Sequence, residues 1–260
     1  MSGHRRSRQA GPGPPAALNR LDGVLVVDKP AGPTSHDIVD VVRRNFRLRK
    51  VGHGGTLDPR ATGVLVLLLG RGTKLSAKFM ASDKVYEGVM RLGVETDTQD
   101  ADGAVVREAD WRSITREQVE GAMAALTGDV WQEPPMVSAK KINGVPLYKL
   151  ARRGQTVERA AKLVHVYRFS LDGFDLPEID FTVRCSRGAY VRTLCADAGA
   201  ALGCGAHLAA LRRTWSGDIG LDRSRRLEDI LEMSEEELEA AVIPLARFGA
   251  TGRERRAPRR

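Results

Sequence analysis

The longest unbroken apolar run of the chain, residues 64–69, is only six residues long and comes directly after a glycine-rich stretch. A helix that crosses a membrane needs about 20 consecutive apolar residues, so the sequence predicts no membrane span. A short apolar run beside glycines instead predicts a buried β-strand that follows a loop. With 260 residues, the chain can form one large domain or two small ones.

Further patterned segments predict strands and helices that alternate irregularly along the chain. The expected strands lie at residues 23–27, 64–69, 85–92, 163–171 and 179–185. The expected helices are 34–46, capped by Thr34 or Ser35; 115–127, with a capping box of Thr115 and Gln118; 190–202; and one near Leu238, capped by Ser234 and Glu237. Because no strict β-α-β rhythm is present, we expect the α+β class with one mixed sheet.

Positive charge is concentrated at the two ends of the chain. The net charge is +8, but residues 1–20 carry four arginines and no acid, and residues 247–260 carry six arginines and one glutamate. The body between them therefore has a net charge of −1. We predict disordered basic tails at 1–20 and 247–260, which attract nucleic-acid phosphates without sequence specificity, and a folded body at 21–246. The alternative is that the tails only aid solubility.

Cysteine usage indicates a reducing compartment. The chain has three cysteines and no CxxC pair, which argues against a disulfide framework. Cys204 and His207 have a CxxH spacing, but no second ligand pair for zinc accompanies them. The Arg-rich N-terminus leads into glycines and prolines, which is not typical of a secretory signal. We expect a cytoplasmic protein without a metal site; the lack of acids before Asp22 leaves an organellar transit peptide as an alternative.

The segment best suited to chemistry is the glycine-rich loop HGGTLDPRATG at residues 53–63. Its glycines allow sharp bends and a close approach to a ligand. Its spacing fits neither GxxxxGK[ST] nor GxGxxG, so it predicts no nucleotide cofactor. Asp58 at its centre is either a turn residue that accepts backbone hydrogen bonds or a reactive carboxylate.

Six sequence blocks occur in a fixed order around this loop. They are KPAGPTS at 29–35, HGGTLDPRATG at 53–63, KVY at 84–86, QEPPMVSAKK at 132–141, CSRGAYVRTL at 185–194, and GAHL at 205–208 with LRR at 211–213. Together they resemble the TruB family of tRNA pseudouridine synthases, over about residues 21–220. The resemblance implies the pseudouridine synthase fold: one mixed, largely antiparallel sheet, with helices and loops flanking a central active-site cleft.

The resemblance also implies a reaction. Members of the family convert uridine to pseudouridine at position 55, in the T-arm of tRNA. The base leaves C1′ through N1 and returns through C5, with no redox change and no water consumed. We therefore expect an isomerase that needs no cofactor and no metal, and whose partner is tRNA.

The matching positions give the expected site. Asp58 corresponds to the family's essential carboxylate, and Arg192 to the arginine that pairs with it and favours its ionised form. Tyr86 corresponds to the tyrosine that stacks on the target base. The other supporting positions are Tyr190 and Leu211, which wall the pocket, and Lys29 and Pro30, which shape its floor, with a possible phosphate contact from Lys29. For Tyr86, Tyr190 and Leu211, simple core packing is the alternative, and for Arg192 a surface position.

Further positions point to RNA contacts. His53 corresponds to a histidine that fills the gap left by a flipped base. Residues 132–154 correspond to a thumb-like loop placed against the T-arm, where Lys140, Lys141, Arg152 and Arg153 face the RNA backbone. Val137 departs from the tyrosine found in many relatives, so this position offers the RNA no aromatic ring.

The end of the chain departs from the family pattern. Relatives commonly continue into an RNA-binding PUA domain, whereas residues 222–246 here are acidic and precede the basic tail. We expect the PUA domain to be missing or vestigial, and the protein to be a monomer. Three alternatives stay open: an RNA chaperone, alone or as a second role; a synthase for another RNA; and a glycoside hydrolase that uses Asp58 with Glu87 or Asp83.

Overall fold

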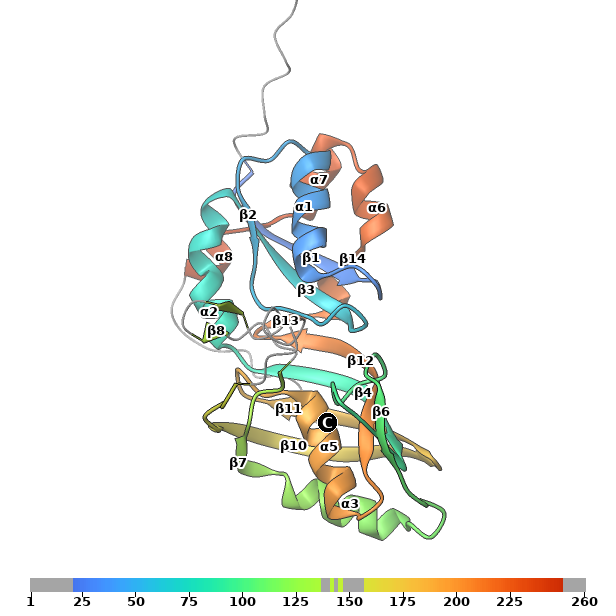
Figure 1. Cartoon of the computed structure of the whole chain (residues 1–260). Coiled ribbons are helices and arrows are strands. Elements are labelled where there is room, and N and C mark those ends of the chain that lie inside the picture. Colours follow the sequence, from blue (N-terminus) through green and yellow to red (C-terminus); the bar gives the residue numbers. More distant parts are fainter. Residues whose placement is uncertain (1–20, 137–140, 143–144, 147–156, 250–260) are drawn as a thin grey trace, which may run out of the picture.

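The computed structural model describes residues 21–136, 141–142, 145–146 and 157–249 of the chain. An 11-stranded mixed sheet runs through the molecule (Figure 1). In spatial order its main path is β14 (Arg225–Arg226), β1 (Gly23–Lys29), β3 (Thr62–Leu69), β12 (Ala206–Ser216), β4 (Lys84–Leu92), β11 (Glu178–Cys185), β10 (Lys162–Asp175) and β7 (Gly128–Gln132). Beside this path, β13 (Ile219–Gly220) pairs with β12, β15 (Ile243–Pro244) with β1, and β2 (Val51–His53) with β3.

Two strand pairs of this sheet, β1 with β14 and β3 with β12, are parallel, and the others are antiparallel. This confirms the expected α+β class with one mixed, largely antiparallel sheet. Two small two-stranded sheets stand apart from it: β5 (Val94–Thr96) with β6 (Val105–Glu108), and β8 (Lys141–Ile142) with β9 (Val145–Pro146).

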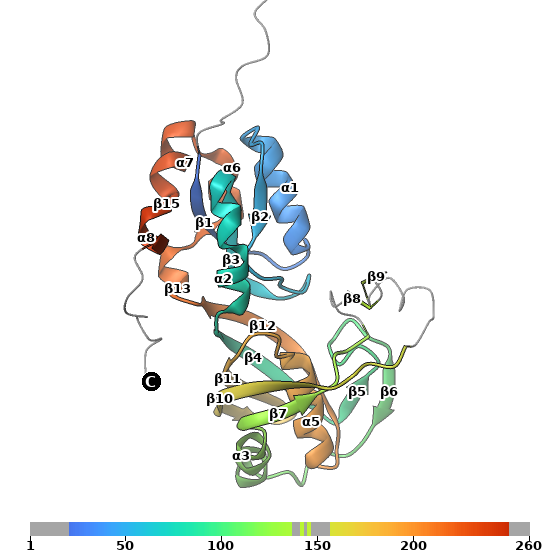
Figure 2. The same ribbon diagram turned by 90° about the vertical axis from the view of Figure 1, so that its left-hand side faces the viewer.

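Strand β3 is covered on both faces, which explains its continuous apolar sequence. Its odd-numbered side chains, from Leu65 to Leu69, pack with α1 (Ser35–Asn45), α6 (Leu227–Glu232) and α7 (Glu235–Ala241). Its even-numbered side chains, from Val64 to Leu68, pack with α2 (Ser76–Ala81) and α8 (Ala246–Gly249). Figure 1 shows these two helix layers on opposite sides of β1 and β3, and in Figure 2 the side that carries α2 faces the viewer.

A second core fills the other half of the sheet. Helices α3 (Arg116–Ala125) and α5 (Val191–Ala201) pack on the same face of β4, β10 and β11 (Figure 1). Phe169 and Phe181 meet edge to face within this core, with ring centroids 5.3 Å apart. No helix of the described residues is both long and apolar enough to span a membrane.

The helix caps follow the sequence closely. Thr34, rather than Ser35, caps α1, and its partner in a reciprocal capping box is Asp37. The expected capping boxes of Thr115 with Gln118 and of Ser234 with Glu237 are confirmed.

Two expectations about element boundaries were wrong, and one long strand was not predicted. Strand β12 was not expected, although it is longer than both of its neighbours, β3 and β4. The glycine-rich loop begins as β2 and ends at Thr62, where β3 starts. Residues 247–249 belong to α8 rather than to a tail, because Phe248 is buried edge to face against Phe79, with ring centroids 5.4 Å apart.

Candidate active site

Asp58 lies on the loop between β2 and β3, and buried contacts hold this loop on both sides of the aspartate. The adjacent Leu57 is buried, and its backbone exchanges two hydrogen bonds with the hydroxyl of Ser35, which accepts at 2.8 Å and donates at 3.0 Å. Gly63 has a φ of +96°, and a Cβ there would lie 2.2 Å from the carbonyl oxygen of Arg213, so only glycine fits. The side chain of Asp58 stays 46% exposed, and a substrate can reach it.

Arg192 is the charged partner of this carboxylate. It is the second residue of α5 and only 4% of its side chain is exposed. Its Nε lies 3.1 Å from Oδ2 of Asp58, and its Nη1 lies 3.0 Å from Oδ2 of Asp100 and donates to the carbonyl of Thr98 at 3.1 Å. The guanidinium therefore bridges two carboxylates, an arrangement that gives strong, directional hydrogen bonds. The structure thus brings together Asp58 and Arg192, as the sequence predicted.

Asp100 was not among the expected site residues. Its Oδ1 accepts hydrogen bonds from the hydroxyl of Thr98 at 2.5 Å and from the N–H of Asp102 at 3.1 Å. The backbone around Asp100 also bonds to Leu208 of β12, so the turn is attached to the sheet. The sequence could have indicated this turn, because Thr98 and Asp100 shortly precede Gly103. Such residues often form hydrogen bonds to the backbone of their own turn.

Burial sets the protonation behaviour of Asp58. Although 46% of the side chain is exposed, the surrounding atoms desolvate the carboxylate, and this raises the pKa of Asp58 above its ordinary value. Arg192 and Lys29 oppose the rise, whereas the charge of Asp100 adds to it. The ionised form of Asp58 therefore depends on its cationic neighbours.

Lys29 supports the loop from inside the protein. The residue is fully buried, and its Nζ donates to the carbonyls of Pro30, Pro59 and Ala61 at 2.8 to 2.9 Å. These three bonds occupy every donor of the ammonium group. The phosphate contact considered for Lys29 is therefore wrong: no donor is left for an RNA phosphate. Desolvation lowers the pKa of Lys29 to about 8.

Arg213 is a second buried cation, and no role was predicted for it. Only 1% of the residue is exposed. It donates to the carbonyl of Val64 at 2.7 Å, of Gly55 at 3.1 Å and of Thr56 at 3.2 Å. These bonds tie β12 to both ends of the Asp58 loop. Its place in the LRR block was visible in the sequence, but its burial was not.

Tyr86 and Leu211 lie where the two halves of the sheet meet. Tyr86 stands opposite Arg213 in the β4–β12 pair, and Leu211 stands opposite Gly88. Both are partly buried and pack against the cores of both halves. Burial raises the pKa of Tyr86, and the charge of Arg213 opposes the rise. Part of the contacts of Tyr86 and Leu211 is therefore core packing, the alternative considered for these residues.

Tyr190 and His53 flank this region. Tyr190 is the half-buried N-cap residue of α5, two residues before Arg192. His53 is the last residue of β2, and its Nδ1 is buried without a hydrogen-bond partner among the described residues. Desolvation lowers the pKa of His53, so the neutral imidazole is favoured.

The expected loop cations are not placed. Lys140, Arg152 and Arg153 lie outside the described residues, and for Lys141 the structure gives only the backbone, in β8. The base of the segment is described: Glu133 and Arg159 form an ion pair there.

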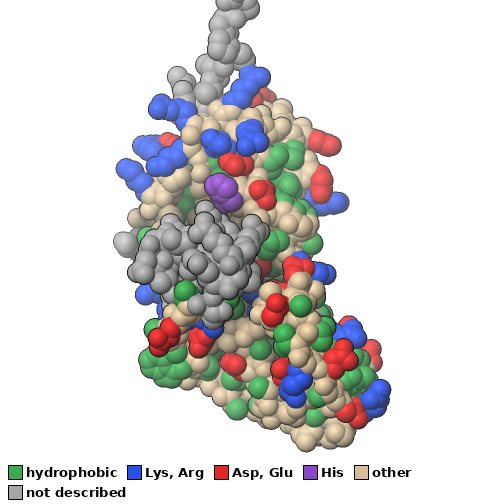
Figure 3. Space-filling view, in the orientation of Figure 1, with side chains coloured by type: hydrophobic (Ala, Val, Ile, Leu, Met, Phe, Trp, Pro, Cys, Tyr) green, Lys and Arg blue, Asp and Glu red, His purple; other side chains and the backbone are tan. Residues whose placement is uncertain are grey.

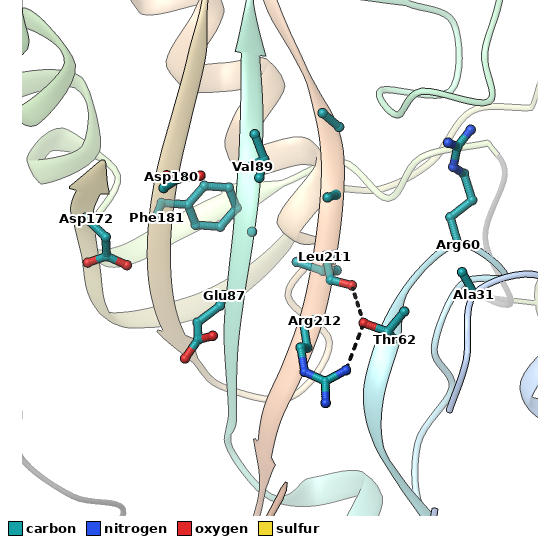
Figure 4. A pocket seen from close by; sticks show the side chains of 13 residues that line it. Ala31, Arg60, Thr62, Glu87, Val89, Asp172, Asp180, Phe181, Leu211 and Arg212 are labelled. Atoms are coloured by element: carbon teal, nitrogen blue, oxygen red, sulfur yellow. Dashed lines mark hydrogen bonds between the residues drawn. The ribbon is translucent and has the colours of Figure 1, made fainter. Parts of the chain in front are cut away.

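A hollow of about 570 Å³ lies beside this centre rather than on it. It opens on the sheet face that carries Glu87, Asp172 and Asp180 (Figure 4). Glu87 follows Tyr86 directly in β4, so their side chains point to opposite faces of the sheet. Asp83 is bonded to Arg184 and to the hydroxyl of Tyr167. Neither acid faces Asp58, so the carboxylate pair that the hydrolase alternative requires is not formed by Glu87 or Asp83.

Family models match most of the chain. The model described as TruB family pseudouridylate synthase (N terminal domain) matches residues 43–191, and that described as tRNA pseudouridylate synthase B C-terminal domain matches residues 192–248. The chain is 48% identical to tRNA pseudouridine synthase B of Opitutus terrae, covering 86% of this chain and 93% of the relative. It is 51% identical to the protein of the same name from Geobacter sulfurreducens, covering 83% and 71%.

Solved structures share the fold. A chain of a Cbf5-Nop10-Gar1 complex matches with a TM-score of 0.69 and 28% identity, covering 86% of this chain and 60% of that one. An H/ACA RNP bound to a substrate RNA containing 2'-deoxyuridine matches with a TM-score of 0.67 and 25% identity, covering 88% and 61%. This chain therefore spans about three fifths of the length of these structural neighbours.

Proposed function

The chain belongs to the TruB family of pseudouridylate synthases, and we propose that it isomerises uridine 55 in the T-arm of tRNA, with Asp58 as the essential carboxylate. The observation that carries this proposal is the contact of 3.1 Å between Arg192 Nε and Asp58 Oδ2, in which the cation is buried and the carboxylate is accessible.

The reaction balances within one nucleotide. The N1–C1′ bond breaks, the base turns, and a C5–C1′ bond forms; the proton on C5 leaves and N1 gains one. An ionised carboxylate beside C1′ can attack it, stabilise oxocarbenium-like charge, or remove a proton from the sugar. All three roles need ionised Asp58, and Arg192 supports that form.

The target base must leave the RNA stack to reach Asp58, and an aromatic face offsets part of the stacking energy that this costs. We assign this face to Tyr86, which stands opposite Arg213, the residue that is bonded to the Asp58 loop. Leu211 and Tyr190 wall the same pocket, while Lys29 and Pro30 support its floor through the bonds to the loop. The neutral, half-buried ring of His53 suits stacking into the gap left by the base.

Several features support an RNA substrate. Exposed cations gather on the upper part of the face in Figure 3, on the segment after α1 and on the η1 (Gly70–Leu75) and α2 segment. They include Arg47, Arg49, Lys50, Lys74 and Lys78. Strand β2 leads from this surface to His53. The cations Lys140, Lys141, Arg152 and Arg153 of the thumb-like segment would add contacts to the T-arm backbone.

The cellular setting is part of the proposal. Three free, buried thiols suit a reducing compartment, so we assign the protein to the cytoplasm. We also expect it to act as a monomer. The arginines at both ends would add phosphate attraction that does not depend on sequence.

The test is pseudouridine formation in a tRNA transcript, mapped by position, with wild type and Asp58→Asn. We expect conversion of uridine 55 by wild type and none by the variant. Conversion at another uridine would overturn the T-arm assignment and favour a synthase for another site or RNA. Binding without conversion by folded wild type would favour the chaperone alternative, which needs contacts but no carboxylate.

A further inference from the structure

Gln132 links the edge strand of the sheet to the helix that carries Arg192. It is the last residue of β7, and only 1% of it is exposed. Its Oε1 accepts from the N–H of Tyr190 at 2.9 Å, and its Nε2 donates to the carbonyl of Tyr190 at 3.2 Å. Because one partner is a donor and the other an acceptor, the orientation of the carboxamide is fixed by the pair.

These two bonds act at the start of α5. Tyr190 is the N-cap residue, and its side chain makes no capping hydrogen bond. The first N–H groups of a helix have no partner within the helix, and the flanking backbone needs other contacts to fix it. Gln132 supplies them from a neighbouring strand, 58 residues away in sequence.

The consequence falls on Arg192, two residues into the helix. Its Nε must point at Asp58 while its Nη1 points at Asp100, and both contacts are about 3 Å long. A helix start that is free to shift changes both distances together. The same shift moves Tyr190, which we place in the pocket wall.

We infer that Gln132 is a positioning residue for the isomerisation, which aims Arg192 at Asp58 by fixing the start of α5. This inference rests on the proposed function, since it concerns the same carboxylate. Gln132 touches no reacting atom; it acts through Tyr190 and Arg192.

The informative variant is Gln132→Leu, which keeps similar bulk but removes both hydrogen bonds. We expect kcat to fall by about 10- to 100-fold, as for a misplacement of about 1 Å at an active site, while the Kd for the tRNA transcript changes little. Because Arg192 lowers the pKa of Asp58, the acid limb of the pH–rate profile should move to higher pH. Gln132→Glu keeps the acceptor for Tyr190 N–H and loses the donor, so its activity should be intermediate.

A core variant separates positioning from mere loss of stability. Val24, on β1, is fully buried in a separate core that contains no residue of α5, so Val24→Ala lowers stability without touching the helix start. Its acid limb should match that of wild type. The inference is overturned if folded Gln132→Leu keeps the wild-type kcat, or if it loses activity with an unmoved acid limb, as expected for a variant such as Val24→Ala that only lowers stability. If Gln132→Leu does not fold, Gln132→Glu is judged by the same two criteria.

Titration of the Asp58 carboxyl by NMR, in full-length protein without RNA, gives the pKa directly. A higher pKa in the Gln132 variants supports the positioning role even if uridine 55 is not the target. An unchanged pKa overturns that role even if uridine 55 is converted. Failure of the proposed function and failure of this inference are therefore distinguishable.

Discussion

The guanidinium of Arg192 lies 3.1 Å from the carboxylate of Asp58, and only 4% of the arginine side chain is exposed, against 46% of the aspartate. The cation is thus fixed inside the protein, while its partner is partly exposed to solvent. Such preorganisation costs no rearrangement at the moment of reaction.

Arg192→Lys should abolish most activity. Lysine offers a point charge in place of a planar fork, so it cannot reach Asp58 and Asp100 at once. We expect kcat to fall by about 100-fold or more, within the range for loss of one preorganised donor. Single-turnover rates measure this. Arg91→Lys, at an exposed ion pair with Glu178, is the matched control and should react like wild type; equal rates for both variants would contradict the assignment.

Asp100→Asn should have two separable effects. Asparagine keeps an acceptor for Arg192 but loses the charge, so Arg192 is held less firmly. A hydrogen bond to a charged group contributes about 1.5–3 kcal/mol. Because part of this contribution is retained, kcat should fall by about 10-fold. The charge of Asp100 also raises the pKa of Asp58. Removing it should therefore move the acid limb of the pH–rate profile to lower pH. A shift to higher pH would mean that Asp100 acts mainly by holding Arg192.

Asp58→Asn should be at least as stable as wild type at neutral pH. The folded-state pKa of Asp58 is raised, so the folded protein disfavours its ionised form, and this cost is present at every pH above that pKa. The neutral amide removes the cost. Thermal unfolding at pH 7 should give a Tm equal to or above that of wild type, and the difference should shrink as acid protonates Asp58. A clearly lower Tm would show that the ion pair with Arg192 outweighs desolvation.

Two cations, Arg192 and Arg213, show how much of the site can be predicted from the sequence. Arg192 was expected beside Asp58 because the motif blocks matched a family, and the structure places it there. Arg213 lies in one of those blocks, but two adjacent arginines are not typical of a central strand, so β12 was not predicted there. Its burial depends on three carbonyls from Gly55, Thr56 and Val64, and such long-range partners cannot be read from local sequence.

The same limit explains the error about Lys29. A lysine before proline in a loop-forming block reads as a solvent-facing cation, since lysine is almost never fully buried unless paired. Here three carbonyls, two of them 30 and 32 residues away, replace the solvent. Periodicity, caps and the apolar run of β3 were readable because they depend on near neighbours.

Lys29→Met should destabilise the fold. The substitution removes the donor of the buried carbonyl of Ala61, and an unsatisfied buried carbonyl costs about 1–3 kcal/mol. The carbonyl of Pro59 keeps a hydrogen bond from the N–H of Gly32. We expect a decrease in the free energy of unfolding of about 1–3 kcal/mol by urea denaturation. Lys50→Met, at an exposed position, should change it little; equal stability of the two variants would show that the loop does not need the buried ammonium.

The pH dependence of this deficit has a definite sign. The pKa of Lys29 is lowered from 10.5 to about 8 in the folded state, so between these values the unfolded chain binds more protons. Titration of Lys29 then stabilises wild type as pH rises through this window. Lys29→Met lacks the contribution, and its deficit should be larger at pH 9.5 than at pH 7. A deficit that is smaller at pH 9.5 would contradict the lowered pKa.

The C-terminal arginines should act through salt-dependent binding. Residues 250–260 carry five arginines and one glutamate, and a deletion that starts at residue 250 spares the buried Phe248. For every phosphate that the deletion leaves unneutralised, the slope of log K against log salt concentration should fall by about 0.7–0.9. We expect weaker tRNA binding at low salt, a shallower slope, and an unchanged kcat at saturation. A full-length protein with these five arginines replaced by glutamine should behave like the deletion. An unchanged slope in both would leave solubility as the role of the tail.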